Sequence, residues 1–230
     1  MFTYLNDLKN FFYPQVCLSC SNSLFASEEV LCLRCQRKLP RTNFHLDPHN
    51  PVIKQFWGKV PVSSATAFYH FAKGGKVQHL IHQLKYKQHP EVGVKIGGLM
   101  GNDLIGSQHF NNLDVVIPVP LHPDKQRTRG YNQSATFALG LAAAMGIASS
   151  VTILQRSKFT ATQTRKHRFE RFENVNRVFT VADHTSLINK NILLVDDVIT
   201  TGSTLTACAE TLLEIEGTTV SIAAIASSMH

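Results

Sequence analysis

Two adjacent carboxylates, Asp196 and Asp197, form the part of the chain with the clearest chemistry. A short apolar run at 192–195 precedes them, and a loop of hydroxyl residues with one glycine follows at 200–204. From 205 to 215 the apolar residues have helical spacing. The stretch therefore predicts a buried strand that stops at an acidic turn, then a hydroxyl-rich loop, and then a helix.

The loop at 200–204 has the composition of an anion site. A loop that opens a helix directs free backbone N–H groups and the positive end of the helix dipole outward, so it can hold a phosphate. Two carboxylates beside a phosphate suit either a magnesium ion or a pair of sugar hydroxyls. Together they predict a ribose phosphate as the ligand. The structural alternative is an acidic cap on an ordinary helix, where Asp and Thr are common.

The stretch 192–204 resembles the phosphoribosyl-pyrophosphate (PRPP) loop of type I phosphoribosyltransferases. In that family the acidic pair bonds the ribose hydroxyls and the hydroxyl-rich loop wraps the 5′ phosphate, with magnesium bridging the pyrophosphate and the sugar. The resemblance implies that Asp196 and Asp197 are the catalytic pair. It also implies a PRPP site made of Asp196, Asp197, Val198, Ile199, Thr200, Thr201, Gly202, Ser203 and Thr204.

Near its start the chain carries two C-x-x-C pairs, separated by eleven residues: Cys17 with Cys20, and Cys32 with Cys35. Two such knuckles can aim four sulfurs at one ion, which predicts a structural zinc site. Disulfides are one alternative, although they fit poorly with a chain that lacks export signals, and a redox pair is another. The module either stabilises a segment too short to fold alone, or presents its basic residues to nucleic acid or protein: Arg34, Arg37, Lys38 and Arg41.

Length and composition narrow the class of protein. A chain of 230 residues can bury one core and add a small module. Its hydrophobic content of 43% excludes a disordered protein. The net charge of +7 favours polyanionic partners such as phosphates or nucleic acid. No apolar run approaches the roughly twenty residues of a membrane span, and polar residues at 6–10 interrupt any signal-peptide segment. We therefore expect a cytoplasmic protein without membrane insertion.

The pattern of the remaining chain predicts an α/β fold. We expect a zinc-binding module at 1–40, a proline-punctuated linker at 41–59 and a sheet-and-helix domain at 60–230. Strands are predicted at 62–71, 113–119, 151–154, 175–181, 192–195 and 220–226, and helices at 77–84, 92–104, 135–145 and 205–215.

A basic turn is predicted at 124–133, directly after the strand at 113–119. In an open α/β sheet, ligands gather at the carboxyl ends of the strands. Lys125, Arg127 and Arg129 are therefore candidates for a pyrophosphate, with a solvated basic turn as the alternative. Turns after Val119, Leu154 and Val195 are expected to meet at one sheet edge. The cation-rich segment 156–171 predicts a lid over the ligand or a track for a nucleic-acid backbone.

Several motifs in this order resemble the ComF (competence protein F) family: the double knuckle, Leu84-Lys85-Tyr86, Pro118 to Pro123, Arg129 to Gln133, Glu173-Asn174-Val175 and the PRPP loop. The resemblance implies a type I phosphoribosyltransferase-like parallel sheet flanked by helices, with a small four-cysteine zinc module. It also implies a role in natural transformation, with PRPP, Zn²⁺ and Mg²⁺ bound. Single-stranded DNA and DNA-uptake or recombination proteins are the implied partners. The alternative is an active phosphoribosyltransferase acting on a small nitrogen acceptor.

Overall fold

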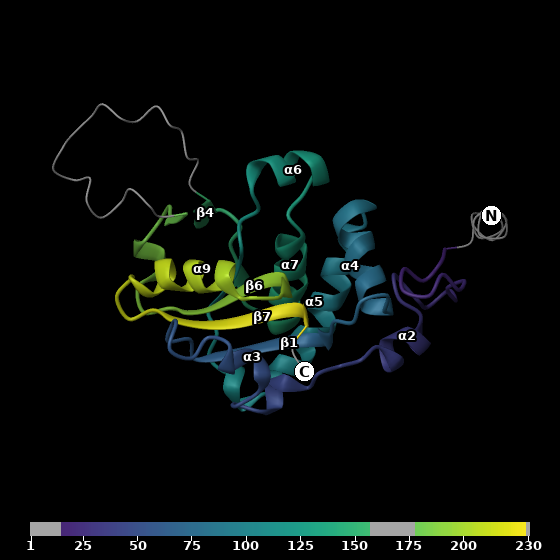
Figure 1. The fold of residues 1–230 in the computed structure, drawn as a ribbon, viewed down its shortest axis with the longest axis horizontal. Coiled ribbons are helices and arrows are strands. Elements are labelled where there is room, and N and C mark those ends of the chain that lie inside the picture. Colours follow the sequence, from purple (N-terminus) through teal and green to yellow (C-terminus); the bar gives the residue numbers. More distant parts are fainter. Residues whose placement is uncertain (1–14, 157–177, 229–230) are drawn as a thin grey trace.

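Apolar side chains cover both faces of the central strand, β6 (Asn191–Ile199), which is typical of a parallel sheet buried between helices. The computed structural model describes residues 15–156 and 178–228. Its main sheet is parallel throughout, in the order β1-β7-β6-β2-β3. The other strands are β1 (Ser64–His70), β2 (Val115–Pro118), β3 (Ala148–Ser149) and β7 (Thr219–Ser227). The predicted parallel α/β sheet is thereby confirmed (Figure 1).

Helices cover the two faces of this sheet. Leu193 and Val195 of β6 face the core formed with α4 (Lys76–Tyr86), α5 (Pro90–Ile105) and α7 (Gln133–Met145). Ile192 and Leu194 face the opposite core, formed with α3 (Pro51–Lys54) and α9 (Ser203–Leu213). The shorter elements are α2 (Leu33–Lys38), η1 (Phe44–Leu46), η2 (Gln108–Phe110) and η3 (Thr185–Leu187).

The acidic pair does not lie in a turn, contrary to the sequence prediction. β6 continues through both carboxylates to Ile199, because β7 supplies ladder partners as far as Ser227. The neighbour on the other side ends earlier: the last pair of β2 with β6 joins Pro118 to Val195. Beyond that point the β2 side of β6 is open, and side chains from other elements can reach the carboxylates.

The predicted basic turn is also a helix, α6 (Pro123–Arg129), which projects from the sheet edge (Figure 1). His122 accepts a hydrogen bond from the backbone N–H of Asp124, and Pro123 occupies the first turn, where its missing N–H costs nothing. The helix ends at Gly130, whose φ of +80° is in the left-handed region. All its residues after the proline are polar, so the sequence has no apolar periodicity from which a helix could be predicted here.

The strand predicted at 151–154 does not join the main sheet. Of its apolar residues only Leu154 is fully buried, while Val151 is exposed. Leu154 begins β4 (Leu154–Arg156), which pairs antiparallel with β5 (Phe179–Val181) in a separate two-stranded sheet. The prediction that this strand belongs to the same sheet as the strands ending at Val119 and Val195 is therefore wrong. Residues 157–177, which hold most of the predicted cation-rich segment, lie outside the described residues.

The segment expected as a linker, 41–59, is folded against the sheet. Asn50 caps α3 through its side-chain oxygen, and its amide nitrogen donates to the carbonyl oxygen of Ala65 in β1 at 2.9 Å. Val52, Ile53 and Phe56 are buried in the core beside α9. Where a domain boundary falls in this part of the chain stays a prediction.

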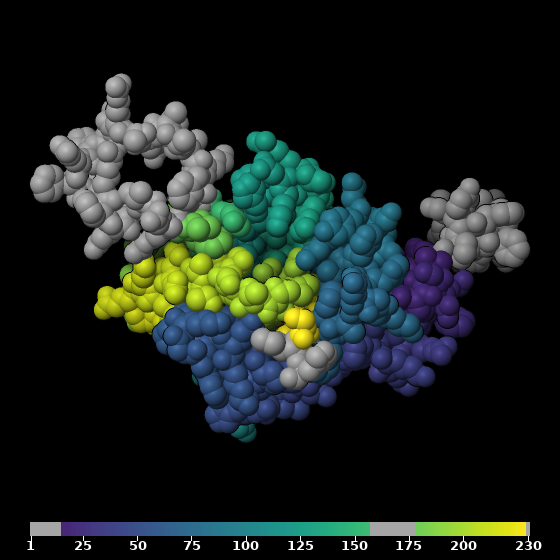
Figure 2. All heavy atoms as spheres, viewed as in Figure 1, coloured from purple at the N-terminus to yellow at the C-terminus, as the bar shows by residue number. Residues whose placement is uncertain are grey.

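The N-terminal module packs on the same core as α4. Cys17, Leu31 and Leu39 are buried in one cluster with Leu80 and Leu84 of that helix. Figure 2 shows the module, in purple, lying against the blue surface of α4. Among residues 15–156 and 178–228, no helix is long and apolar enough to cross a membrane.

Candidate functional site

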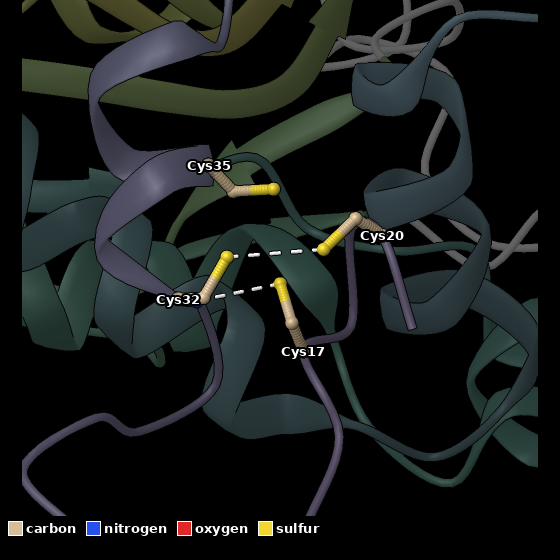
Figure 3. Close-up of side chains that lie close together, drawn as sticks. All are labelled: Cys17, Cys20, Cys32 and Cys35. Atoms are coloured by element: carbon tan, nitrogen blue, oxygen red, sulfur yellow. Dashed lines mark hydrogen bonds between the residues drawn. The ribbon is translucent and has the colours of Figure 1, made fainter. Parts of the chain in front are cut away.

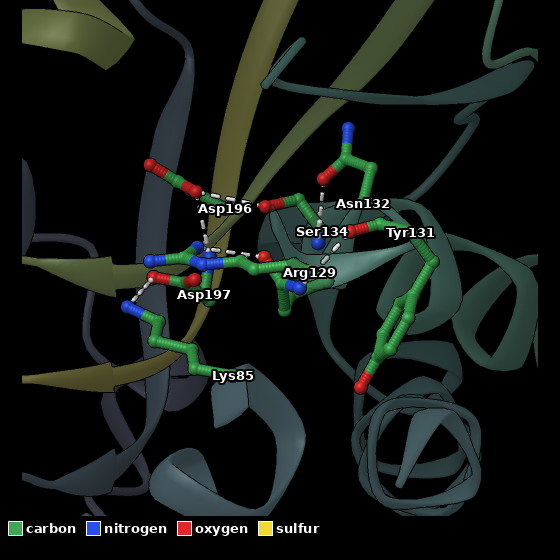
Figure 4. A network of polar contacts seen from close by, with 8 residues as sticks. Lys85, Arg129, Tyr131, Asn132, Ser134, Asp196 and Asp197 are labelled. Carbon is green, nitrogen blue, oxygen red and sulfur yellow. Dashed lines mark hydrogen bonds and ion pairs between the residues drawn. The ribbon is translucent and has the colours of Figure 1, made fainter. Parts of the chain in front are cut away.

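The buried carboxylate of Asp197 is paired with a lysine from a distant element. Lys85 Nζ lies 2.7 Å from Asp197 Oδ1, and the two side chains are only 20% and 13% exposed. Lys85 stands in the last turn of α4, so this ion pair joins α4 to the end of β6 (Figure 4). A cation thus already sits against the acid pair.

Asp196 is held by hydroxyl and backbone donors. Its Oδ1 accepts a hydrogen bond from Ser134 Oγ at 2.8 Å and another from the backbone N–H of Asp197 at 2.8 Å. Ser134 lies in the first turn of α7, whose cap, Asn132, accepts from the Ser134 N–H at 3.0 Å. Asn132 also donates to the carbonyl oxygen of Val119 at 2.9 Å. The start of α7 is thereby fixed to the chain that leaves β2.

The pKa of Asp196 is raised to about 7, chiefly by burial and also by the neighbouring charge of Asp197. The hydrogen bonds from Asp197 and Ser134, and the charge of Lys85, oppose this rise. A site that holds two carboxylates against one ammonium carries an excess of negative charge. It is suited to a divalent cation, or to hydroxyl groups that donate to carboxylate oxygens.

The hydroxyl-rich loop lies directly after β6 and opens α9. Thr200, Thr201, Ser203 and Thr204 are exposed, whereas Gly202 is buried and has a φ of +72°. A Cβ at Gly202 would lie 3.2 Å from the Phe56 ring, so a side chain would strain both the backbone and the packing. The loop is further tied down by Gln55, whose Nε2 donates to the Thr200 carbonyl oxygen at 2.6 Å.

The other predicted PRPP residues divide into two groups. Ile199 is buried in the core and Val198 is partly buried, so they can offer a ligand only their backbone. Arg129 approaches the site: its Nη1 donates at 2.8 Å to Gln133, the residue before Ser134. Lys125 and Arg127 are exposed along α6, and no contact within the described part of the chain joins them to the acid pair.

Sequence reasoning gave no role to Lys85 or Ser134. Both lie in or beside motifs of the ComF resemblance, Leu84-Lys85-Tyr86 and Arg129 to Gln133, which is the only signal that pointed to them. Their contacts with the carboxylates span 112 and 62 residues of sequence. Pairing over such separations is set by how α4 and α7 pack on the sheet, and a sequence pattern does not contain it.

The four N-terminal cysteines lie together, as predicted (Figure 3). Their sulfurs are all within 4.8 Å of one another, and Cys20 Sγ is 3.8 Å from Cys32 Sγ. A tetrahedral zinc with bonds of about 2.3 Å separates its sulfurs by about 3.8 Å, so the cluster fits this ion. The backbone N–H of Cys32 donates to Cys17 Sγ at 3.3 Å, an arrangement that suits a thiolate. The cysteines are free, so the disulfide alternative is not what the structure contains.

A family model described as phosphoribosyl transferase domain matches residues 132–230. The match contains Ser134, the acid pair and the loop, and it begins after Lys85 and the cysteines.

Two curated relatives have names that concern DNA. The DNA utilization protein YhgH of Salmonella typhi is 30% identical over 146 residues, which cover 62% of this chain and 63% of that protein. The chain thus spans less than two thirds of that relative's length. Competence protein F of Haemophilus influenzae is 25% identical over 224 residues, covering 90% of this chain and 94% of that protein.

Solved structures with a similar fold include the glutamine PRPP amidotransferase from B. subtilis, complexed with ADP and GMP. It is 22% identical with a TM-score of 0.41, and the match covers 61% of this chain and 30% of that one. The adenine phosphoribosyltransferase from Leishmania tarentolae is 14% identical with a TM-score of 0.37, over 62% of this chain and 73% of that one.

Proposed function

Because the chain is a phosphoribosyltransferase-fold relative of competence protein F, we propose that it binds PRPP with magnesium and acts in the handling of incoming single-stranded DNA. The proposed PRPP binding is supported by the arrangement of side chains near the end of β6. Asp196 and Asp197 lie at its open edge, and the exposed hydroxyls of the 200–204 loop follow at the start of α9.

In this proposal each part of the ligand has its own residues. The ribose hydroxyls donate to Asp196 and Asp197, and the 5′ phosphate accepts from the backbone N–H groups and hydroxyls of Thr200 to Thr204. Arg129 is the proposed pyrophosphate contact, with Lys125 and Arg127 further along α6. Magnesium bound with the ligand near Asp196 and Asp197 would neutralise charge on the pyrophosphate.

The DNA half of the proposal is supported by the names of the relatives and by charge. DNA utilization protein and competence protein F are names of proteins related over most of this chain, and the chain carries a net charge of +7. Binding of a single-stranded oligonucleotide should weaken steeply with salt, because counterions are released from the phosphates. Fluorescence anisotropy at several salt concentrations tests this, and affinity independent of salt would contradict it.

An active transferase is the alternative, since an acid pair that holds the sugar and a cation that holds the pyrophosphate are also what transfer at C1′ requires. Pyrophosphate release from PRPP, measured against a panel of bases and amines, separates the two. Turnover with one acceptor would favour the transferase. Binding without turnover would favour PRPP as a bound effector in DNA handling.

We further propose that Cys17, Cys20, Cys32 and Cys35 hold a structural zinc ion. In the proposed division the cysteine module ends near residue 40 and the phosphoribosyltransferase-like domain begins near residue 60. DNA-uptake or recombination proteins in the cytoplasm are the proposed protein partners.

The experiment that tests the ligand is calorimetric titration with PRPP, with and without magnesium. Wild-type protein should bind, and the double variant Asp196→Asn with Asp197→Asn should lose the binding heat. Asp183→Asn is a matched control, since Asp183 is an exposed carboxylate whose contacts are with Thr185 and Ser186. Equal affinity of the wild type and the double variant would overturn the site assignment.

A further inference from the structure

Ser19 places a buried hydroxyl inside the cysteine cluster. It lies between Cys17 and Cys20 in the first knuckle, and it is only 5% exposed. Within residues 15–156 and 178–228, its Oγ atom has no hydrogen-bond partner, although it is closed to solvent. A hydroxyl that has lost its bonds to water without gaining another destabilises the fold, and such a group in a native structure calls for a physical reason.

The sulfurs of the two knuckles are supported by different donors. The backbone N–H of Cys32 donates to Cys17 Sγ at 3.3 Å. Burial raises the pKa of the Cys17 thiol, but backbone N–H groups from both knuckles outweigh this effect and lower the pKa to about 7. The pKa of the Cys35 thiol is instead raised to about 12, chiefly by burial, and the Ser19 hydroxyl opposes this rise. Backbone donors thus act on Cys17, and a side-chain hydroxyl acts on Cys35.

We propose that Ser19 is a positioning residue of the cysteine cluster, whose hydroxyl donates to Cys35 Sγ when the four sulfurs hold a zinc ion. The zinc ion itself rests on the proposed function. A thiol is a weak acceptor, which explains why the hydroxyl makes no hydrogen bond to the Cys35 thiol. The form that binds zinc is the thiolate, and a charged sulfur is a stronger acceptor for an O–H donor. The hydroxyl thus gains its partner when Cys35 becomes a ligand.

The turn that carries Ser19 is held by backbone hydrogen bonds on both sides. The N–H of Ser21 donates to the Cys17 carbonyl oxygen at 2.8 Å. The N–H of Leu18 donates to the carbonyl oxygen of Val30 at 2.9 Å, which joins the first knuckle to the chain before the second. Ser19 is therefore held in place against the second knuckle. A hydrogen bond from a fixed donor sets the direction of a metal ligand, and losing such a partner lowers metal affinity about 10–100-fold.

The first experiment compares zinc affinity in the full chain and two variants, by competition with a chromophoric chelator. Ser19→Ala removes only the hydroxyl oxygen and should bind zinc about tenfold more weakly. Ser19→Thr keeps a hydroxyl and should bind zinc as the wild type does. Thr66→Val is the matched control, because Thr66 of β1 also has a buried hydroxyl without a partner in the described part of the chain. Thermal unfolding verifies that each variant is folded.

Replacing zinc by Co²⁺ gives a second readout, which packing alone does not change. A hydrogen bond to a thiolate stabilises the electrons of the sulfur, so it raises the energy of the sulfur-to-cobalt charge-transfer absorption. In Ser19→Ala this absorption should move to longer wavelength. In Ser19→Thr and in Thr66→Val it should coincide with that of the wild type.

The outcomes separate the role of Ser19 from the zinc site itself. Wild-type affinity in Ser19→Ala, with or without a shifted absorption, overturns the contribution of Ser19 to metal binding and leaves the zinc site standing. Weaker binding with an unshifted absorption assigns Ser19 to packing and overturns the hydrogen bond. A Ser19→Thr variant as weak as Ser19→Ala does the same. A wild-type chain that takes up no zinc overturns the zinc site, and the role of Ser19 with it.

Discussion

The cysteine cluster and the acid pair are assembled in opposite ways. The four cysteines come from two knuckles within residues 17–35, and each knuckle contributes two sulfurs from neighbouring turns of chain. The acid pair and its partners come from three elements, since Lys85 lies on α4, Ser134 on α7 and the carboxylates on β6. The first site is local in sequence, and the second exists only when helices and sheet are packed.

This difference predicts how each site fails. A local site depends on its own ligands, so losing one cysteine should abolish it. The acid pair is held by several side chains from different elements. Losing one of them should lower the stability by an amount that depends on how buried the lost contact is. The two regions also share a core, because the cysteine module packs on α4, the helix that carries Lys85. A substitution that unfolds the cysteine module should therefore also disturb the position of Lys85 beside the acid pair.

The largest effect is expected from Cys20→Ser. A zinc site with three thiolates binds its ion far more weakly, and apparent binding energies of structural zinc are about 10–16 kcal/mol. We expect bound zinc to fall from one ion per chain to none, with a lower unfolding temperature, by elemental analysis and thermal unfolding. Cys208→Ser is the control, because Cys208 is a buried thiol of α9 outside the cluster. Full zinc content in Cys20→Ser would contradict a four-sulfur site.

The same contrast explains what could be predicted from the sequence. The spacing of Cys17 to Cys35 contains the whole first site, and the apolar run before Asp196 identifies the central strand. Helices with apolar periodicity, such as α4, α5 and α7, were predicted near their observed bounds. α6 was missed because its residues are polar on all sides. β4 was placed in the wrong sheet because a short apolar run does not say with which strand it pairs.

Lys85→Met should have the next largest effect. It leaves the buried Asp197 carboxylate without its cation, and removing one partner of a buried pair costs about 3–5 kcal/mol, less where water reaches the pair. Because both side chains are slightly exposed, we expect about 2 kcal/mol in urea unfolding at pH 7. Lys190→Met is the matched control: its pair with Asp114 is longer, 3.4 Å, and more exposed, and should contribute under about 1 kcal/mol. Equal losses would show that burial does not set the strength of these pairs.

The raised pKa of Asp196 gives a pH dependence. The unfolded chain releases this proton near pH 4, about the usual value for Asp, whereas the folded chain releases it at about 7. Between these values the folded state binds more protons, so this group lowers the stability as the pH rises. Asp196→Asn should remove that decline and raise the free energy of unfolding above pH 7, by on the order of 2 kcal/mol. Urea unfolding at pH 5 and pH 8 measures it. If the free energy of unfolding of the variant changes with pH as steeply as that of the wild type, the titrating group is not Asp196.

The smallest effect is expected from Gln55→Ala, which tests whether the segment expected as a linker belongs to the site. Gln55 donates to the Thr200 carbonyl oxygen, at the first residue of the proposed phosphate loop. One hydrogen bond at a partly exposed position contributes about 0.5–1.5 kcal/mol. We therefore expect PRPP affinity to fall about threefold, with little change in unfolding temperature. Lys54→Ala, an exposed neighbour, should leave the affinity unchanged. If Gln55→Ala behaves like this control, the loop holds its shape through Gly202 and Phe56, and the 41–59 segment supports it by packing alone.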